Sequence, residues 1–122
     1  MPFSTGLIYN PPSSADQATQ LIVTCVNDSL NIPANIEIQV FRWDTSQAAR
    51  IPIGHNLFQL RPQVSETLLY PLTSAAYIEV QSDYFSATST VIHAYTLDST
   101  GVILQRVLQS EMVWVDRFTN IP

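Results

Sequence analysis

The sequence predicts an all-β fold: a single β-sandwich or jelly roll of about eight or nine short antiparallel strands with an N-terminal arm. Three observations support this prediction. Apolar and polar residues alternate with a period of two along most of the chain, which is the pattern of half-buried strands. Turn-forming residues separate these segments at a spacing of roughly 8–12 residues, as in sandwiches. A chain of 122 residues, 46% of them hydrophobic, has room for one domain with one core.

The first strands are expected at residues 20–27 (QLIVTCVN) and 35–43 (NIEIQVFRW), each followed by a polar connection. In the second segment one face carries Ile36, Ile38 and Val40, and the other carries Glu37, Gln39, Phe41 and Trp43. Further strands are expected at residues 51–53, 57–60, 67–72, 76–81, 88–97, 102–108 and 112–115. Residues 98–101 (DSTG) are a strong turn signal between the strands at 88–97 and 102–108.

The N-terminal segment differs from the rest of the chain. Pro2 and the pair Pro11-Pro12 bracket the apolar residues 3–9 (FSTGLIY), and the paired prolines are typical of a stiff spacer. Two interpretations stay open: a first strand of the chain's own sheet, or an arm that adds a strand to a neighbouring subunit. The second interpretation makes Phe3, Leu7, Ile8 and Tyr9 the candidate subunit-interface residues. The expected organisation is an arm and spacer at 1–17, a sandwich domain at 18–116 and a tail at 117–122.

The composition favours packing against other protein chains. The sequence has no lysine, and its polar residues are mainly neutral: 23 Ser and Thr, nine Gln and six Asn. Soluble β-proteins normally use lysine to keep sheet edges from pairing with other chains. A surface of hydroxyls and amides suits close packing, so a homo-oligomer or homopolymer is expected.

Charge and hydropathy argue against other partners. A net charge of −5 with five scattered arginines gives neither the basic surface that nucleic acid requires nor a polybasic patch for membranes. No apolar stretch approaches the ~20 residues of a membrane helix, so no membrane insertion is expected. Residues 1–4 have neither a basic nor a long apolar region, so no classical signal peptide is visible.

Residues suited to catalysis or metal binding are sparse. His55 follows Gly54 in an expected loop and is expected to be solvated, whereas His93 lies within an expected strand at a half-buried position. The sequence lacks a G-x-S-x-G, HExxH, P-loop or GxGxxG motif. The lone Cys25 lies in an apolar run, where it is expected to be a small buried side chain. We therefore expect no enzyme, no cofactor, and no catalytic or metal-binding residues.

Aromatic residues offer an alternative function. Sandwich domains bind sugars through exposed rings, and the candidates are Trp43, Tyr84, Phe85 and Trp114. Tyr84 and Phe85 lie between two expected strands, whereas packing in a core or interface is the other role open to all four rings. The alternative is thus a carbohydrate- or ligand-binding module on a cell or spore surface, with a surface glycan as its partner.

Two segments carry a resemblance to a known class of proteins. Residues 91–101 (VIHAYTLDSTG) and 106–111 (RVLQSE) resemble small β-sandwich surface proteins of endospore-forming bacteria, and the pattern extends over residues 20–115. An arm ahead of a jelly-roll body also looks like the subunits of endospore appendages, which are pilus-like fibres. The resemblance implies an extracellular or spore-surface structural subunit whose arm reaches a neighbour while body strands pair laterally. Appendage subunits commonly carry several cysteines, whereas this chain has only Cys25, so packing and strand pairing would replace disulfides.

Overall fold

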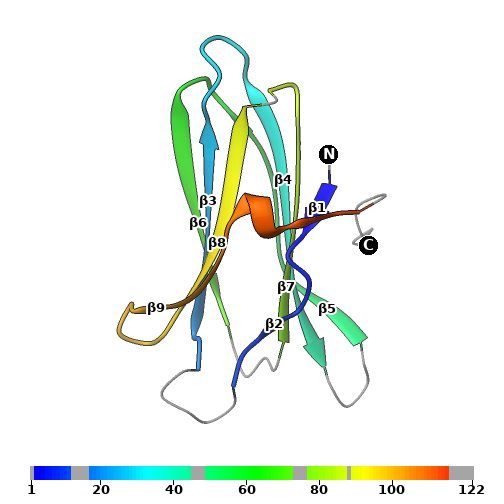
Figure 1. Cartoon of the computed structure of the whole chain (residues 1–122), viewed down its shortest axis with the longest axis vertical. Coiled ribbons are helices and arrows are strands. Elements are labelled where there is room, and N and C mark those ends of the chain that lie inside the picture. The colour runs from blue at the N-terminus through cyan, green and yellow to red at the C-terminus, as the bar shows by residue number, and fades with distance from the viewer. Residues whose placement is uncertain (1, 12–16, 45–48, 73–76, 88, 116–122) are drawn as a thin grey trace.

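The chain folds into two antiparallel β-sheets packed face to face, so the prediction of an all-β sandwich is confirmed (Figure 1). The computed structural model describes residues 2–11, 17–44, 49–72, 77–87 and 89–115. The six-stranded sheet contains β1 (Pro2–Ser4), β2 (Ile8–Tyr9), β4 (Ala34–Asp44), β5 (Ala49–Leu60), β7 (Tyr77–Phe85) and β10 (Val113–Trp114). The four-stranded sheet contains β3 (Gln20–Asn27), β6 (Val64–Pro71), β8 (Thr90–Leu97) and β9 (Ile103–Val107). The 3-10 turn η1 (Gln109–Glu111) precedes β10.

The strand order determines which strands lie at the edges. The six-stranded sheet has the order β10-β1-β7-β4-β5, and β2 also pairs with β7. The four-stranded sheet has the order β6-β3-β8-β9. Among the described strands, the edges are therefore β10 and β5 in one sheet and β6 and β9 in the other.

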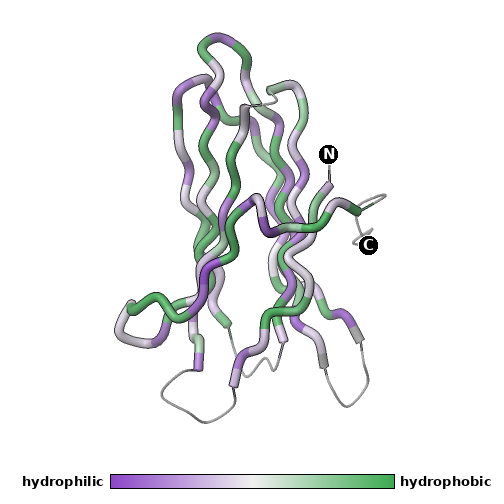
Figure 2. Tube along the Cα trace, in the orientation of Figure 1, coloured by the Kyte–Doolittle hydropathy of each residue, from purple (hydrophilic) through white to green (hydrophobic). Residues whose placement is uncertain are grey.

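The hydrophobic core fills the space between the two sheets. Hydrophobic and hydrophilic residues alternate along the central strands, as the colours of Figure 2 show. The side chains that face inward with 0% exposure include Leu21, Val23, Cys25, Ile36, Ile38, Val40, Ile78, Val80 and Ile92. Burying one large aliphatic side chain stabilises a fold by about 1.5–3 kcal/mol, so this alternation is the main determinant of the sandwich.

The clearest predictions of strands are confirmed. Strand β3 spans the expected residues 20–27, and β4 extends the expected segment 35–43 by one residue at each end. The turn after β8 is also confirmed: the Asp98 carboxylate accepts hydrogen bonds from the Thr100 hydroxyl (2.7 Å) and from the N–H of Val102 (3.0 Å). These hydrogen bonds, the Thr100 hydroxyl first, lower the pKa of Asp98.

The prediction of two short strands at 51–53 and 57–60 is wrong, because β5 is continuous through Gly54. A side-chain Cβ at Gly54 would lie 2.5 Å from the ring of Tyr70, so the glycine permits close packing between β5 and β6 and ends no strand. His55 consequently lies in a strand and not in a loop, although it is exposed as expected.

Strand β7 is also longer than expected. Its predicted end at residue 81 is wrong, and Tyr84 and Phe85 lie inside the strand. The polar residues Ser82 and Asp83 continue the pairing with β4 opposite Ile38 and Glu37, because a hydrogen-bonded neighbour extends a strand across polar positions. At the C-terminal end, by contrast, the strand expected at 112–115 is reduced to two residues.

The N-terminal segment pairs with its own chain in this structure. β1 lies between β7 and β10, and β2 pairs with the other end of β7 (Figure 1). The tail 117–122 lies outside the described residues.

Candidate functional site

A polar cluster around Glu79 lies on the outer face of the six-stranded sheet. Oε2 of Glu79 accepts hydrogen bonds from the Ser4 hydroxyl (2.7 Å) and from Nε2 of Gln81 (3.1 Å). Oε1 accepts a hydrogen bond from Nε1 of Trp43 at 3.1 Å and forms an ion pair with Nε of Arg50 at 3.1 Å. The cluster thus connects β1, β4, β5 and β7 through one carboxylate.

Strand register explains how these residues meet. Glu79 lies opposite Phe41 on β4, and Tyr77 lies opposite Trp43. The guanidinium carbon of Arg50 lies 5.1 Å from the ring centroid of Phe41 and 4.9 Å from that of Trp43, within the range of a cation–π contact. The carboxylate is engaged by four donors within the fold, one of them a guanidinium, so we assign this cluster a structural role.

This outer face is less exposed than the alternation alone indicated. Phe41 is 1% exposed and Gln39 is 2% exposed. Among the described residues, Oε1 of Gln39 is a buried side-chain oxygen without a hydrogen-bond partner. Next to it in the register, Nε2 of His55 lies 2.6 Å from the Glu37 carboxylate. Most polar groups of this face are therefore paired within the sheet.

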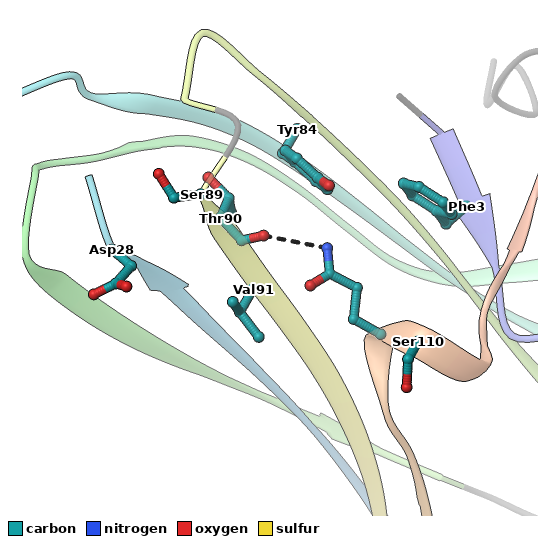
Figure 3. Close-up of a pocket in the computed structure, with 8 residues that line it drawn as sticks. Phe3, Asp28, Tyr84, Ser89, Thr90, Val91 and Ser110 are labelled. Atoms are coloured by element: carbon teal, nitrogen blue, oxygen red, sulfur yellow. Dashed lines mark hydrogen bonds between the residues drawn. The ribbon is translucent and has the colours of Figure 1, made fainter.

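A cavity of 420 Å³ opens between the two sheets beside β1. Phe3 and Tyr84 line it from the six-stranded sheet, and Thr90 and Val91 line it from β8 (Figure 3). The rings of Phe3 and Tyr84 are stacked, with centroids 6.1 Å apart and an interplanar angle of 13°. The Gln109 side chain, from η1, donates a hydrogen bond to the carbonyl oxygen of Thr90 at 3.2 Å, which ties η1 to β8.

The four aromatic ligand candidates do not form one site. Trp43 and Phe85 lie near opposite ends of the β4–β7 ladder, opposite Tyr77 and Asn35 respectively. Trp43 is half-buried in the Glu79 cluster, and Trp114 is 55% exposed on the edge strand β10. Of these four, Tyr84 is the one that lines the cavity.

The four subunit-interface candidates divide into two pairs. Ile8 is 6% exposed and belongs to the core, and Phe3 is half-buried against Tyr84. Leu7 and Tyr9, in contrast, are 55% and 52% exposed. The first pair holds the segment to the body, and the second pair leaves apolar surface open to solvent.

Cys25 and His93 are held within the fold. Cys25 is fully buried, as expected, and burial together with the nearby Glu66 carboxylate raises its pKa to about 12. Nδ1 of His93 accepts a hydrogen bond from the backbone N–H of Gln109 at 2.9 Å. Across the described ranges, no three His, Cys, Asp or Glu side chains lie close enough to hold a metal ion. Nor does that part of the chain contain a helix long and apolar enough to span a membrane.

Sequence reasoning missed both the Glu79 cluster and the cavity. Glu79 and Gln81 had the ordinary signature of a solvated strand face, and only the register against β1 and β5 brings Ser4 and Arg50 to them. The cavity is lined in part by Gln109 and Ser110 of η1. A turn this short contains too few residues to show a hydrophobic periodicity in the sequence.

The fold is similar to that in the crystal structure of Thermotoga maritima 1070. The TM-score is 0.57, and the alignment covers 94% of this chain and 94% of that chain at 13% sequence identity. This likeness extends to the fold alone. No family model matches the chain, and no curated protein matches it.

Proposed function

We propose that the chain is a structural subunit that assembles with copies of itself into a homopolymeric fibre on an extracellular or spore surface. The observation that carries the proposal is the edge strand β6. Within the described part of the chain, β6 pairs only with β3, through eight residues in unbroken register. Ser65, Glu66, Thr67 and Leu69 of this strand are exposed. An edge of this length can accept another strand.

The other edges carry features that oppose such pairing. The β4–β5 ladder has a register shift between Val40 and Phe41, and β5 contains Pro52, which has no N–H to donate. The β8–β9 ladder shifts between Thr96 and Leu97, and β10 has two residues. Natural sheets protect their edges by bulges, prolines, short strands and charged side chains, lysine above all. Between Ser65 and Leu69, β6 has no bulge, proline or lysine, and its one charged residue there is Glu66.

Two copies of β6 can pair without placing like charges opposite one another. In an antiparallel register centred on Thr67, Ser65 would face Leu69 of the partner subunit and Glu66 would face Leu68 of the partner subunit. Side chains alternate between the two faces of a strand, so residues whose numbers are both odd or both even point to the same face. The two residues of each pair therefore lie on the same face of the joined sheet. A register centred on Glu66 would instead oppose two carboxylates and is disfavoured.

The N-terminal segment supplies a second, different contact. A β6–β6 pair is two-fold symmetric and closes on itself, so a fibre needs another interface. Strand addition by the arm provides one, with Leu7 and Tyr9 exposed beside it. The jelly-roll connectivity expected from the sequence stays a prediction within this proposal.

Electron microscopy of the purified full chain tests this function. We expect filaments by negative stain, and light scattering that rises with protein concentration above a threshold. A chain that stays strictly monomeric at high concentration, with no filaments in the images, would contradict the proposal.

A ligand-binding module is the second candidate, and the cavity beside Tyr84 is the observation that favours it. It predicts saturable glycan binding that is lost when Ser110, which lines the cavity, is replaced in Ser110→Arg. The matched control is Ser99→Arg, at an exposed turn position after β8. Absence of binding to a glycan array, or equal binding by both variants, would remove this candidate.

A further inference from the structure

The N-terminal arm consists of two parts joined at Gly6. The outer part is β1 with Thr5, and the inner part is β2 with Asn10. Gly6 has a φ of +69°, and a Cβ at this position would meet nothing within 4 Å. The next residue, Leu7, is 55% exposed. An open glycine between two anchored segments has the properties of a hinge.

The inner part is fixed to its own body. Ile8 lies in the core at 6% exposure. Asn10 is 2% exposed, and its side chain binds one residue twice: Oδ1 accepts the N–H of Ala18 at 2.7 Å, and Nδ2 donates to the carbonyl oxygen of Ala18 at 3.2 Å. Release of this part would expose Ile8 and leave buried amide groups without partners.

The outer part occupies a slot with paired backbone on both sides. Phe3 lies opposite Ser82 of β7 and opposite Trp114 of β10. The N–H of Thr5 donates to the carbonyl oxygen of Val80 at 3.0 Å, and the Thr5 hydroxyl accepts the N–H of Val80 at 3.0 Å. A slot between two strands accepts only another extended segment, because unpaired backbone groups would otherwise line it.

Side chains give this slot its specificity. The Ser4 hydroxyl reaches the Glu79 carboxylate at 2.7 Å, and Phe3 stacks on Tyr84 (Figure 3). The same residues from a second copy would make every one of these contacts. An exchanged β1 would therefore lose no pairing relative to the unexchanged chain.

We propose that residues 2–5 exchange between subunits about the Gly6 hinge, while residues 8–10 stay on their own subunit. The inference rests on the proposed assembly and names the part of the arm that makes the contact. Four extended residues span at most about 14 Å. The slot of the neighbour must therefore open close to Gly6, so successive subunits touch along their β1–β10 sides.

Engineered disulfides distinguish the two parts of the arm. One variant carries Pro2→Cys with Asp83→Cys, and the matched variant carries Tyr9→Cys with Tyr77→Cys; both pairs are direct cross-strand partners. Such partners have the Cα separation that a disulfide requires. Cys25 stays in place, because it is fully buried. Each full-length variant is assembled under reducing conditions, oxidised, and separated on a non-reducing denaturing gel.

The proposal expects covalent dimers or larger multimers for the 2–83 pair and a monomer with an internal disulfide for the 9–77 pair. Covalent multimers from both pairs would mean that the whole arm exchanges, which overturns the division at Gly6. Filaments that give only monomers for the 2–83 pair would overturn exchange itself. If the unsubstituted chain forms no polymer, the proposed function fails first and the inference with it.

Discussion

The two sheets of this sandwich differ in how their polar side chains are paired and in how regular their edge strands are. On the six-stranded sheet, Glu79 binds three donors from three other strands and one from its own strand. The long edge strand β5 of this sheet is interrupted by a register shift and a proline. On the four-stranded sheet, the central strands β3 and β8 contain no Asp, Glu or Arg, and the edge β6 is regular. The six-stranded sheet pairs most of the polar groups of its outer face internally, whereas the four-stranded sheet has a regular edge strand, β6, that pairs with β3 alone among the described strands.

The largest effect is expected at the carboxylate of the six-stranded sheet. Glu79→Leu should lower the free energy of unfolding by about 3–5 kcal/mol, because it removes the carboxylate that accepts hydrogen bonds from the buried Ser4 and Gln81 and from the half-buried Trp43. Urea denaturation measures the change. The control is Glu66→Leu on the exposed edge β6, which should change stability by less than about 0.5 kcal/mol. Equal losses of unfolding free energy in Glu79→Leu and Glu66→Leu would mean that the Glu79 cluster does not stabilise its sheet more than an exposed edge residue does.

A smaller effect is expected where β5 and β6 meet. Gly54→Ala places a Cβ about 2.5 Å from the ring of Tyr70, and the overpacking should cost about 1–3 kcal/mol in the free energy of unfolding. In a Tyr70→Leu background the same substitution should cost less, since the ring is gone. A double-mutant cycle by urea denaturation measures this coupling, and a cost that is unchanged in that background would refute the close-packing account.

The smallest effect is expected from the buried thiol of Cys25 in the four-stranded sheet, and it concerns the stability at alkaline pH. The folded pKa of Cys25 is raised from 9.0 to about 12, so the folded state binds the proton more tightly than the unfolded state. Stability is therefore fully present below pH 9.0 and falls as the pH rises towards about 12. At about pH 10 the loss should be about 1 kcal/mol relative to neutral pH.

Chemical denaturation between pH 7 and about 10.5 checks this slope, with Cys25→Ala as the comparison. The variant should lose part of the alkaline slope, and Tyr70, whose pKa burial also raises, should account for the rest. A slope unchanged in Cys25→Ala would show that the thiol does not contribute.

Period-two alternation was sufficient to predict the fold class, the bounds of β3 and the two faces of β4. It failed at Gly54, because a glycine that ends a strand and one that admits a neighbouring ring have the same local signature. It also failed for Tyr84 and Phe85, where pairing with β4 carries the strand across polar residues. The Glu79 cluster depends on register between residues up to 75 positions apart, which no local pattern encodes.

The exchange of β1 and the pairing of β6 stay predictions that arose from different features. The prolines around residues 3–9 marked the arm in the sequence, but the anchor at Asn10 and Ala18 became evident only from their contacts. The edge character of β6 needed the strand order. Composition had indicated that the surface suits packing against other protein chains, but it could not say which strand edge is unprotected.

The most direct test of the central claim compares one lysine on each edge. Thr67 is exposed in the middle of β6, and Gln59 is exposed on β5. Sedimentation velocity over a concentration series gives the assembly threshold of the unsubstituted chain, Thr67→Lys and Gln59→Lys. A lysine on an open edge opposes strand pairing, so Thr67→Lys should raise the threshold at least about tenfold while Gln59→Lys leaves it unchanged. Equal thresholds for all three proteins, or a larger effect from Gln59→Lys, would contradict the assignment of β6 as the open edge.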